Sequence, residues 1–266
     1  MNKEEYYKAI AKHYNREAET YEERQHNNKA LHKIRNDFRQ VVIDYICGHN
    51  VMDLGCGTGS DICFFAAKYG EKSFTGIDLS SEMIEKAGNK AEKQKLTNIS
   101  LKVASLAGKP GKYDFIYTFF GVLNTVHDLN ETVDQLYNHL NNNGRIVVTF
   151  VNKWYPLGML GYIRRLKFKK AFERLKPTWG GYSEKQPLES KTWYGNDIIK
   201  RFKKFKLLYK RGYSIVFPAW YQDRIVQKLG GLAEKLWQMD IYLSQTPLWS
   251  WGEYVLLVFE KKADNS

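Results

Sequence analysis

The sequence has little cysteine and no long run of hydrophobic residues. Its 266 residues include three cysteines, Cys47, Cys56 and Cys63, an odd number without metal-type spacing. We therefore expect no disulfide framework and no metal site, and a reducing, cytoplasmic setting. The first residues lack the apolar core of a signal peptide, and no stretch approaches the length of a membrane-spanning helix, so we expect no transmembrane segment.

Excess positive charge is absent from the first part of the chain. Residues 1–150 hold nineteen Lys/Arg and nineteen Asp/Glu, whereas residues 151–266 hold twenty-two and ten, so the net charge of +12 lies entirely in the second part. All seven tryptophans also lie there, from Trp154 to Trp251. A neutral part and a basic, aromatic part predict different binding tasks. The total length fits one domain with insertions.

The chain is organised around residues 50–67. A short apolar run ends at Asp53, glycines follow at positions 55, 57 and 59, and a helical pattern begins at Ile62. Glycine permits positive φ and lets a flat group approach the main chain, while the helix start presents unpaired N–H groups. This strand, turn and helix predict a site for a nucleotide-like ligand.

Spacing distinguishes between nucleotides. A dinucleotide site has Gly-x-Gly-x-x-Gly and binds pyrophosphate, whereas this loop is Gly-x-Gly-x-Gly directly after Asp53. A carboxylate there would repel pyrophosphate and suits a cationic ligand. A second strand-like run ends at Asp78, where a doubly wound sheet places the carboxylate that binds ribose hydroxyls. Both features favour S-adenosylmethionine.

Two stretches, Val51–Gly59 and Gly76–Ser80 followed by Met83 and Ala87, together resemble the class I S-adenosylmethionine-dependent methyltransferases of small-molecule type. The resemblance extends from about Tyr14 to Phe150 and to the closing strands. It implies an α/β fold with a Rossmann-like, doubly wound, mostly parallel seven-stranded sheet whose last strand is antiparallel. It also implies a single methyltransferase domain over residues 1–266, with a helical lid over residues 1–46.

The resemblance implies roles for individual residues. Asp53 and the loop glycines would hold the methionine part of the cofactor, Asp78 the ribose, and Met83 and Leu106 the faces of the adenine. Ser105 stands where the family commonly has a carboxylate facing adenine, and either its hydroxyl or a backbone group would replace that contact. Tyr14 and Tyr21 either touch the cofactor from the lid or only pack that helix onto the domain. The complete expected cofactor set is Tyr14, Tyr21, Asp53, Gly55, Cys56, Gly57, Asp78, Leu79, Met83, Ser105, Leu106 and Phe119.

Candidate catalytic residues follow the fourth expected strand, 113–119. The crevice of a doubly wound sheet opens at the carboxyl ends of its central strands, so residues 119–127 should face the transferring methyl group. Asn124 could orient a nucleophile, and His127 could accept its proton, because imidazole titrates near neutrality. The alternative for His127 is a structural or solvated histidine.

Two insertions, 153–192 and 217–249, interrupt the expected fold on the acceptor side. The first contains the basic stretch 163–176, which, if helical, is amphipathic. Such a helix lies on an anionic membrane, binds an anionic partner, or is only a solvated face. The aromatic residues around it suit a flat or lipophilic ligand as well as a small core.

We predict an enzyme that methylates oxygen or nitrogen of a small or amphiphilic metabolite, which could be anionic or lipid-linked. Nucleic acid ranks behind these acceptors, because no RNA module is recognisable and an Asn-Pro-Pro-Tyr type signature is missing after the fourth strand. An RNA methyltransferase and a non-catalytic S-adenosylmethionine-binding protein are the alternatives. A nicotinamide enzyme is a further one.

Overall fold

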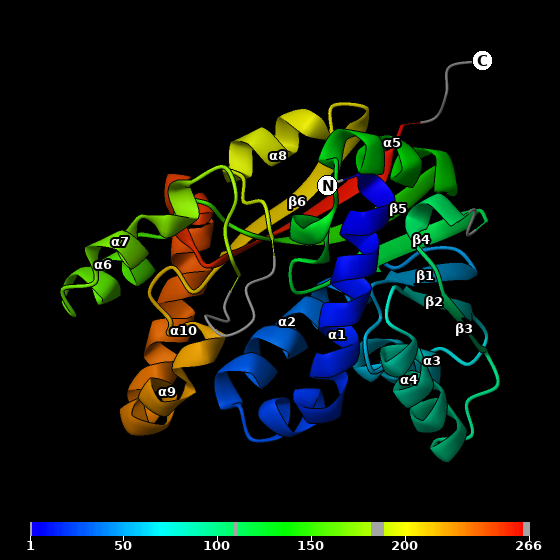
Figure 1. Cartoon of the computed structure of the whole chain (residues 1–266), viewed down its shortest axis with the longest axis horizontal. Helices are drawn as coiled ribbons and strands as arrows, with labels where there is room; N and C mark the ends of the chain where they lie inside the picture. Colours follow the sequence, from blue (N-terminus) through cyan, green and yellow to red (C-terminus); the bar gives the residue numbers. More distant parts are fainter. Residues whose placement is uncertain (1, 109–110, 182–188, 263–266) are drawn as a thin grey trace.

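The chain forms a seven-stranded sheet with helices on both faces (Figure 1), as seen in a computed structural model that describes residues 2–108, 111–181 and 189–262. The strand order is β3-β2-β1-β4-β5-β7-β6. In the described sheet β7 pairs antiparallel with both β5 and β6, and the other neighbouring strands pair parallel, which confirms the predicted Rossmann-like architecture. The strands are β1 (Asn50–Leu54), β2 (Ser73–Asp78), β3 (Ile99–Val103), β4 (Tyr113–Thr118), β5 (Leu140–Val151), β6 (Phe205–Tyr213) and β7 (Tyr254–Lys261).

The helices pack in two layers. Helices α2, α3, α4, α9 and α10 pack on one face of the sheet. Helices α5 and α8 pack on the other face. Their bounds are α1 (Lys3–His26), α2 (Lys29–Tyr45), α3 (Ser60–Lys68), α4 (Ser81–Lys93), α5 (Leu129–His139), α6 (Pro156–Ile163), α7 (Phe168–Ala171), α8 (Gly195–Arg201), α9 (Asp223–Leu229) and α10 (Gly231–Ser244). Short 3-10 helices are η1 (Leu106–Gly108), η2 (Val122–Thr125), η3 (Glu173–Leu175), η4 (Trp220–Gln222) and η5 (Pro247–Trp251).

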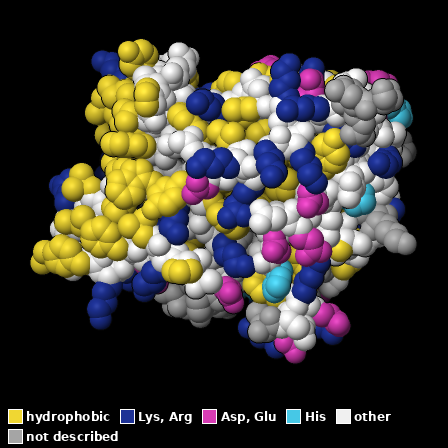
Figure 2. Space-filling view, turned by 90° about the horizontal axis from the view of Figure 1, so that it is seen from above, with side chains coloured by type: hydrophobic (Ala, Val, Ile, Leu, Met, Phe, Trp, Pro, Cys, Tyr) yellow, Lys and Arg dark blue, Asp and Glu magenta, His cyan; other side chains and the backbone are white. Residues whose placement is uncertain are grey.

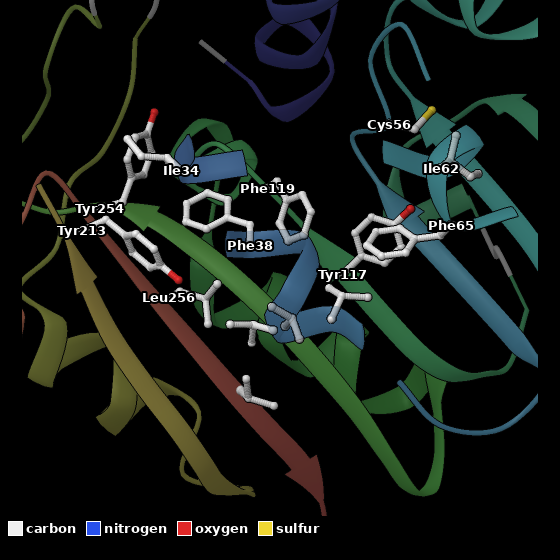
Figure 3. Packing of buried hydrophobic residues seen from close by; sticks show 14 of the residues in the cluster. Ile34, Phe38, Cys56, Ile62, Phe65, Tyr117, Phe119, Tyr213, Tyr254 and Leu256 are labelled. Atoms are coloured by element: carbon white, nitrogen blue, oxygen red, sulfur yellow. The ribbon is translucent and has the colours of Figure 1, made fainter. Parts of the chain in front are cut away.

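Aromatic side chains join α2 to the centre of the sheet. Phe38 of α2 is fully buried, and its ring centroid lies 5.4 Å from that of Phe119 and 4.8 Å from that of Tyr213 (Figure 3). The ring of Tyr254 of β7 belongs to the same group, with its centroid 6.1 Å from that of Phe38. Burial of rings this large is a major favourable term in folding. It also fixes the carboxyl end of β4, where Phe119 begins the loop that faces the ligand side.

Both insertions differ locally from the expected helices. The basic stretch 163–176 is not one helix, because α6 ends at Ile163 and the chain turns through Leu166, whose φ is +56°, before α7 begins. In the second insertion, the sequence of residues 220–237 has a helical pattern, but the chain forms two helices there, α9 and α10, which are divided at Gly230, whose φ is +51°. A positive φ ends the α-helical hydrogen-bond ladder in each case.

Candidate active site

The glycine loop between β1 and α3 is tied to the neighbouring strand β2. The N–H groups of Gly55 and Cys56 donate to the carbonyl of Ile77 at 2.8 and 3.1 Å. Gly57 has a φ of +52°, and a Cβ added there would point into open space with no protein atom within 4 Å. The loop therefore presents bare main chain to a cavity, as a site for a flat ligand requires.

Asp78 connects this loop to the start of α4. Its Oδ2 accepts a hydrogen bond from the N–H of Gly57 at 2.9 Å, and its Oδ1 accepts one from the N–H of Ser80 at 2.9 Å. Each oxygen retains a lone pair for ribose hydroxyls. Desolvation by burial raises the pKa of the Asp78 carboxyl, although these N–H groups oppose the shift. Ser80 also caps α4, since its Oγ accepts from the N–H of Met83.

Asp53 lies at the end of β1 and is buried. Desolvation raises the pKa of its carboxyl well above the usual range, and the nearby carboxylates of Asp61 and Asp78 raise it further. A cationic ligand placed beside Asp53 would favour its ionised form again. The site thus fits a ligand with a positive charge next to the glycine loop.

All twelve residues predicted to bind the cofactor line one cavity. Its walls come from the glycine loop, the end of β2, η1, the end of β4 and one side of α1. Their individual roles stay predictions, but a single cavity brings together side chains from positions 14 to 119. The predicted residues on its wall are Tyr14, Tyr21, Asp53, Gly55, Cys56, Gly57, Asp78, Leu79, Met83, Ser105, Leu106 and Phe119.

Helix α1, the predicted lid, is held across this cavity by polar contacts at several points. Asn15 Oδ1 accepts the hydroxyl hydrogen of Ser80 at 2.5 Å. Glu22 forms an ion pair with Lys90 of α4, and Lys3 forms one with Glu131 of α5. Burial raises the pKa of the Tyr14 and Tyr21 hydroxyls, so both remain protonated donors at neutral pH.

Arg35 of α2 also lines the cavity and was missed by the sequence analysis. Its side chain is buried, its Nε lies 3.6 Å from Asp61 Oδ2, and its guanidinium lies 4.8 Å from the centroid of the Phe120 ring. The available signal was an arginine at a position of α2 that shares a face with Leu31 and Phe38. Buried arginine usually has a partner, and here Arg35 and its partner Asp61 both line the cavity.

A second cavity adjoins the first. Its wall includes His13 and Glu17 of α1, Trp179 and Trp220 of the two insertions, and the buried ring of Tyr254. Five residues line both cavities, so the second cavity lies directly beside the first. The shared residues are Tyr14, Tyr21, Arg35, Phe120 and Thr125.

Of the two predicted catalytic residues, Asn124 lines the second cavity and His127 does not. Asn124 is buried at the edge of the second cavity, where its Nδ2 donates to the carbonyls of Val151 and Lys191 at 3.0 and 2.7 Å. Its Oδ1 accepts from the N–H of Val151 at 2.8 Å. The ring of His127 packs edge-on against Tyr6, with centroids 5.6 Å apart, and is not among the residues lining either cavity.

Among the described residues, no group of three or more His, Cys, Asp or Glu side chains is arranged so that it could hold a metal ion. Within the same described ranges, no helix is both long and apolar enough to cross a membrane.

Comparison with known proteins agrees with the fold and gives a family. A family model described as "Methyltransferase domain" matches residues 47–203. The chain is 28% identical over 154 residues to the ribosomal protein L11 methyltransferase of Lactobacillus johnsonii, which covers 57% of this chain and 42% of that protein. It is 27% identical over 227 residues to an uncharacterised protein of Methanocaldococcus jannaschii, covering 82% and 78%. The chain thus spans less than half the length of the first of these relatives.

A solved structure shows the same fold. Geranyl diphosphate C-methyltransferase from Streptomyces coelicolor, determined with Mg2+, geranyl diphosphate and S-adenosyl-L-homocysteine, superposes with a TM-score of 0.57 at 13% identity, covering 87% of this chain and 80% of that one. The family match extends over more than half of the chain. The protein therefore belongs to the class I S-adenosylmethionine-dependent methyltransferases, and S-adenosylmethionine is its cofactor.

Proposed function

We propose that this methyltransferase moves the methyl group to an oxygen or nitrogen of a small or amphiphilic metabolite that is anionic or lipid-linked. The observation that carries the proposal is the second cavity, which shares five wall residues with the cofactor cavity and is bounded by aromatic side chains of both insertions. A chamber of this kind suits a flat or apolar acceptor beside the methyl donor.

The methionine end of the cofactor is matched by two opposite charges. An amino acid in its zwitterionic form has a cationic amino group and an anionic carboxylate, and the cavity wall offers the Asp53 carboxylate and the Arg35 guanidinium. We assign the amino group to Asp53 and the carboxylate to Arg35. Asp78 would bind the ribose, while Met83 and Leu106 would pack on the adenine, with Ser105 at its edge.

Catalysis requires alignment more than covalent chemistry. The bound cofactor supplies an activated sulfonium methyl group, so the protein has to hold the acceptor atom in line with it and remove a proton where the acceptor carries one. His13 and Glu17 lie on the wall of the acceptor cavity, whereas His127 lines neither cavity. We therefore propose His13 or Glu17 as the proton acceptor. Asn124 would have a positioning role, since its amide holds the loop after β4 to the main chain of Val151 and Lys191.

An amphiphilic or anionic acceptor is supported by the outer hollow beside the second cavity. Lys153 and Lys170 line this hollow together with Tyr155, Tyr162 and Trp179. The combination of cations and rings would bind a lipophilic group that carries negative charge. Geranyl diphosphate, present in the Streptomyces structure, is a ligand of that protein with this general character. We also propose that such an acceptor can be reached from an anionic membrane surface.

An RNA methyltransferase is the alternative that the basic second part of the chain favours, since cations with interleaved aromatic rings can bind a nucleic acid strand. A non-catalytic S-adenosylmethionine-binding protein is the other. The acceptor class separates these alternatives from the proposed function.

The decisive experiment follows labelled methyl groups. Purified protein and labelled S-adenosylmethionine are added to a cell extract that is then fractionated into organic-phase lipids, small soluble metabolites and RNA. Label in lipids or metabolites is expected, whereas label in RNA would overturn the proposed acceptor class. Binding of S-adenosyl-L-homocysteine without transfer to any fraction would favour the non-catalytic alternative. An Asp78→Ala variant should lose cofactor binding, while Asp44→Ala, an exposed carboxylate of α2, serves as the control.

A further inference from the structure

The segment from α6 to η3 exposes large apolar side chains among cations. Leu166 is 79% exposed and Phe168 is 54% exposed, and Leu160 and Phe172 are exposed as well. We call residues 160–172 the basic tip, because four further exposed side chains in it are positively charged: Arg164, Arg165, Lys167 and Lys169. Figure 2 shows hydrophobic side chains gathered at the end of the molecule where α6, α7, α9 and α10 lie in Figure 1.

The turn between α6 and α7 holds Leu166 outward. The N–H of Leu166 donates to the carbonyl of Ile163 at 2.9 Å, and the N–H of Lys167 donates to the carbonyl of Tyr162 at 3.0 Å. Leucine rarely adopts a positive φ, yet these two hydrogen bonds fix Leu166 at +56°. The exposed apolar side chain is thus presented by a closed turn and is not at the end of a frayed helix.

The four exposed cations of the basic tip are available to a partner. Arg164, Arg165, Lys167 and Lys169 form no ion pair with any residue in the described part of the chain. Leu166 and Phe168 alternate with them in the sequence. Cations that remain at the level of lipid headgroups, while neighbouring apolar groups enter the acyl boundary, are typical of interfacial membrane segments.

We propose that the basic tip docks the protein on an anionic lipid membrane. Leu166 and Phe168 enter the interface, and the four cations bind the negatively charged headgroups. Charge complementarity selects an anionic surface, and the protruding leucine and phenylalanine select one with an apolar layer beneath the charge. A second copy of the chain would carry the same positive charge and would be repelled.

The same helices lead toward the active site. Met159 and Tyr162 of α6 and Lys170 of α7 line the outer hollow, and Trp179 and Trp220 belong to both this hollow and the acceptor cavity. The docked protein would therefore receive an amphiphilic acceptor through the hollow next to the basic tip. This route rests on the proposed function, whereas the docking itself can be tested without any methyl transfer.

Docking is measured by flotation of the full chain with phosphatidylcholine vesicles that contain or lack phosphatidylglycerol. The wild type should float with the anionic vesicles, and Leu166→Ser/Phe168→Ser should reduce the partition coefficient at least about tenfold. Arg164→Gln/Lys167→Gln should reduce it by about fivefold for each charge removed. Lys203→Gln/Lys206→Gln, which removes two exposed cations from the region of α8 and β6, is the charge-matched control and should float like the wild type.

Several outcomes would overturn the docking proposal. One is a wild type that does not float with anionic vesicles, and another is a Leu166→Ser/Phe168→Ser variant that floats as well as the wild type. An equal loss of vesicle binding in Arg164→Gln/Lys167→Gln and in the control Lys203→Gln/Lys206→Gln would show that the protein is attracted by its net charge alone. A wild-type dimer in sedimentation that Leu166→Ser/Phe168→Ser abolishes, without vesicle binding, would assign the tip to self-association. Binding of S-adenosyl-L-homocysteine by every variant, measured by calorimetry, separates failure of docking from failure of the cofactor site.

Discussion

Ser80 donates its hydroxyl hydrogen to Asn15 over 2.5 Å and so joins the lid helix α1 to the first turn of α4. The same hydroxyl accepts the N–H of Met83, and the N–H of Ser80 donates to Asp78. One serine therefore connects the lid, the helix cap and the carboxylate expected to bind ribose. Asn15 accepts through its amide oxygen, and an aspartate at this position would provide an accepting oxygen as well.

Removing this lid contact should speed release of the cofactor product. Asn15→Ala is expected to increase the dissociation rate of S-adenosyl-L-homocysteine by about three- to tenfold, since a net hydrogen bond contributes about 1 kcal/mol. Asn15→Asp should stay near the wild-type rate. Stopped-flow displacement measures the rate, with Glu19→Ala on the exposed side of α1 as control. Equal rates in Asn15→Ala and the wild type would show that the contact does not restrain the lid.

Two glycines of the loop should respond differently to the same substitution. A Cβ at Gly57 meets no protein atom, so Gly57→Ala should cost only about 1 kcal/mol of stability for its positive φ while placing a methyl group in the cofactor cavity. A Cβ at Gly55 would lie 2.5 Å from Val122 Cγ2, so Gly55→Ala should destabilise the fold more, by about 2–4 kcal/mol. Thermal unfolding and calorimetric cofactor titration compare the two. The assignment fails if Gly57→Ala binds cofactor like the wild type.

Arg35 and Arg39 provide a matched pair on α2. Arg39 Nε binds Asp61 Oδ1 at 2.7 Å and is not a wall residue of the cofactor cavity, whereas Arg35 is. We expect Arg35→Gln to weaken binding of S-adenosyl-L-homocysteine about tenfold, the value of one hydrogen bond to a charged group. Binding of methylthioadenosine, which has no amino acid part, should not change.

Arg39→Gln should retain affinity for both ligands. Calorimetry of the wild type and the two variants with the two ligands gives the six affinities that the comparison requires. An Arg35→Gln variant with unchanged affinity for S-adenosyl-L-homocysteine would contradict the assignment of Arg35 to the cofactor carboxylate and leave this guanidinium to the acceptor.

Asn124 is expected to stabilise the folded protein. Asn124→Ala removes the partner of three backbone groups, the buried N–H and carbonyl of Val151 and the partly buried carbonyl of Lys191, so the free energy of unfolding should fall by about 2–4 kcal/mol. His127→Gln should keep its catalytic rate within about threefold, because that ring lines neither cavity. Denaturant unfolding and pH–rate profiles measure the two effects. A normal unfolding curve for Asn124→Ala together with a large loss of rate would instead support the catalytic roles predicted from the sequence.

Asp240 should make the stability depend on pH. Its carboxylate accepts the N–H groups of Ser214, Val216 and Phe217, which attaches α10 to the end of β6. Burial outweighs these hydrogen bonds and raises the pKa of Asp240 to about 6. Since the folded state then binds the proton more tightly than the unfolded chain, this contribution to stability is present at acidic pH and is lost as pH rises through about 6.

The test compares the wild type with Asp240→Asn, which does not titrate. Relative to this variant, the wild type should be more stable at pH 4.5 than at pH 7.5, by on the order of 2 kcal/mol. Urea unfolding at both pH values gives the difference. A stability difference that is the same at both would show that Asp240 has an ordinary pKa in the fold.

The cofactor side could be predicted because its contacts follow from local chain geometry. Strand ends, glycines and the carboxylates of Asp53 and Asp78 occur in a fixed order, and parallel strands bring them to one edge of the sheet. The acceptor side could not, because its wall combines α1 with Trp179, Trp220 and Tyr254, and only tertiary packing brings these together. The break at Leu166 was missed since leucine gives no signal for a positive φ.

The position of α1 as a wall of both cavities has a consequence for the order of events in turnover. Tyr14 and Tyr21 touch both chambers, so any displacement of the helix that opens one changes the other. The affinities of donor and acceptor are then thermodynamically linked, and each ligand alters the affinity for the other by the same factor. Saturating S-adenosylmethionine should lower the dissociation constant of the acceptor. Release of S-adenosyl-L-homocysteine from beneath α1 should limit the rate of successive turnovers.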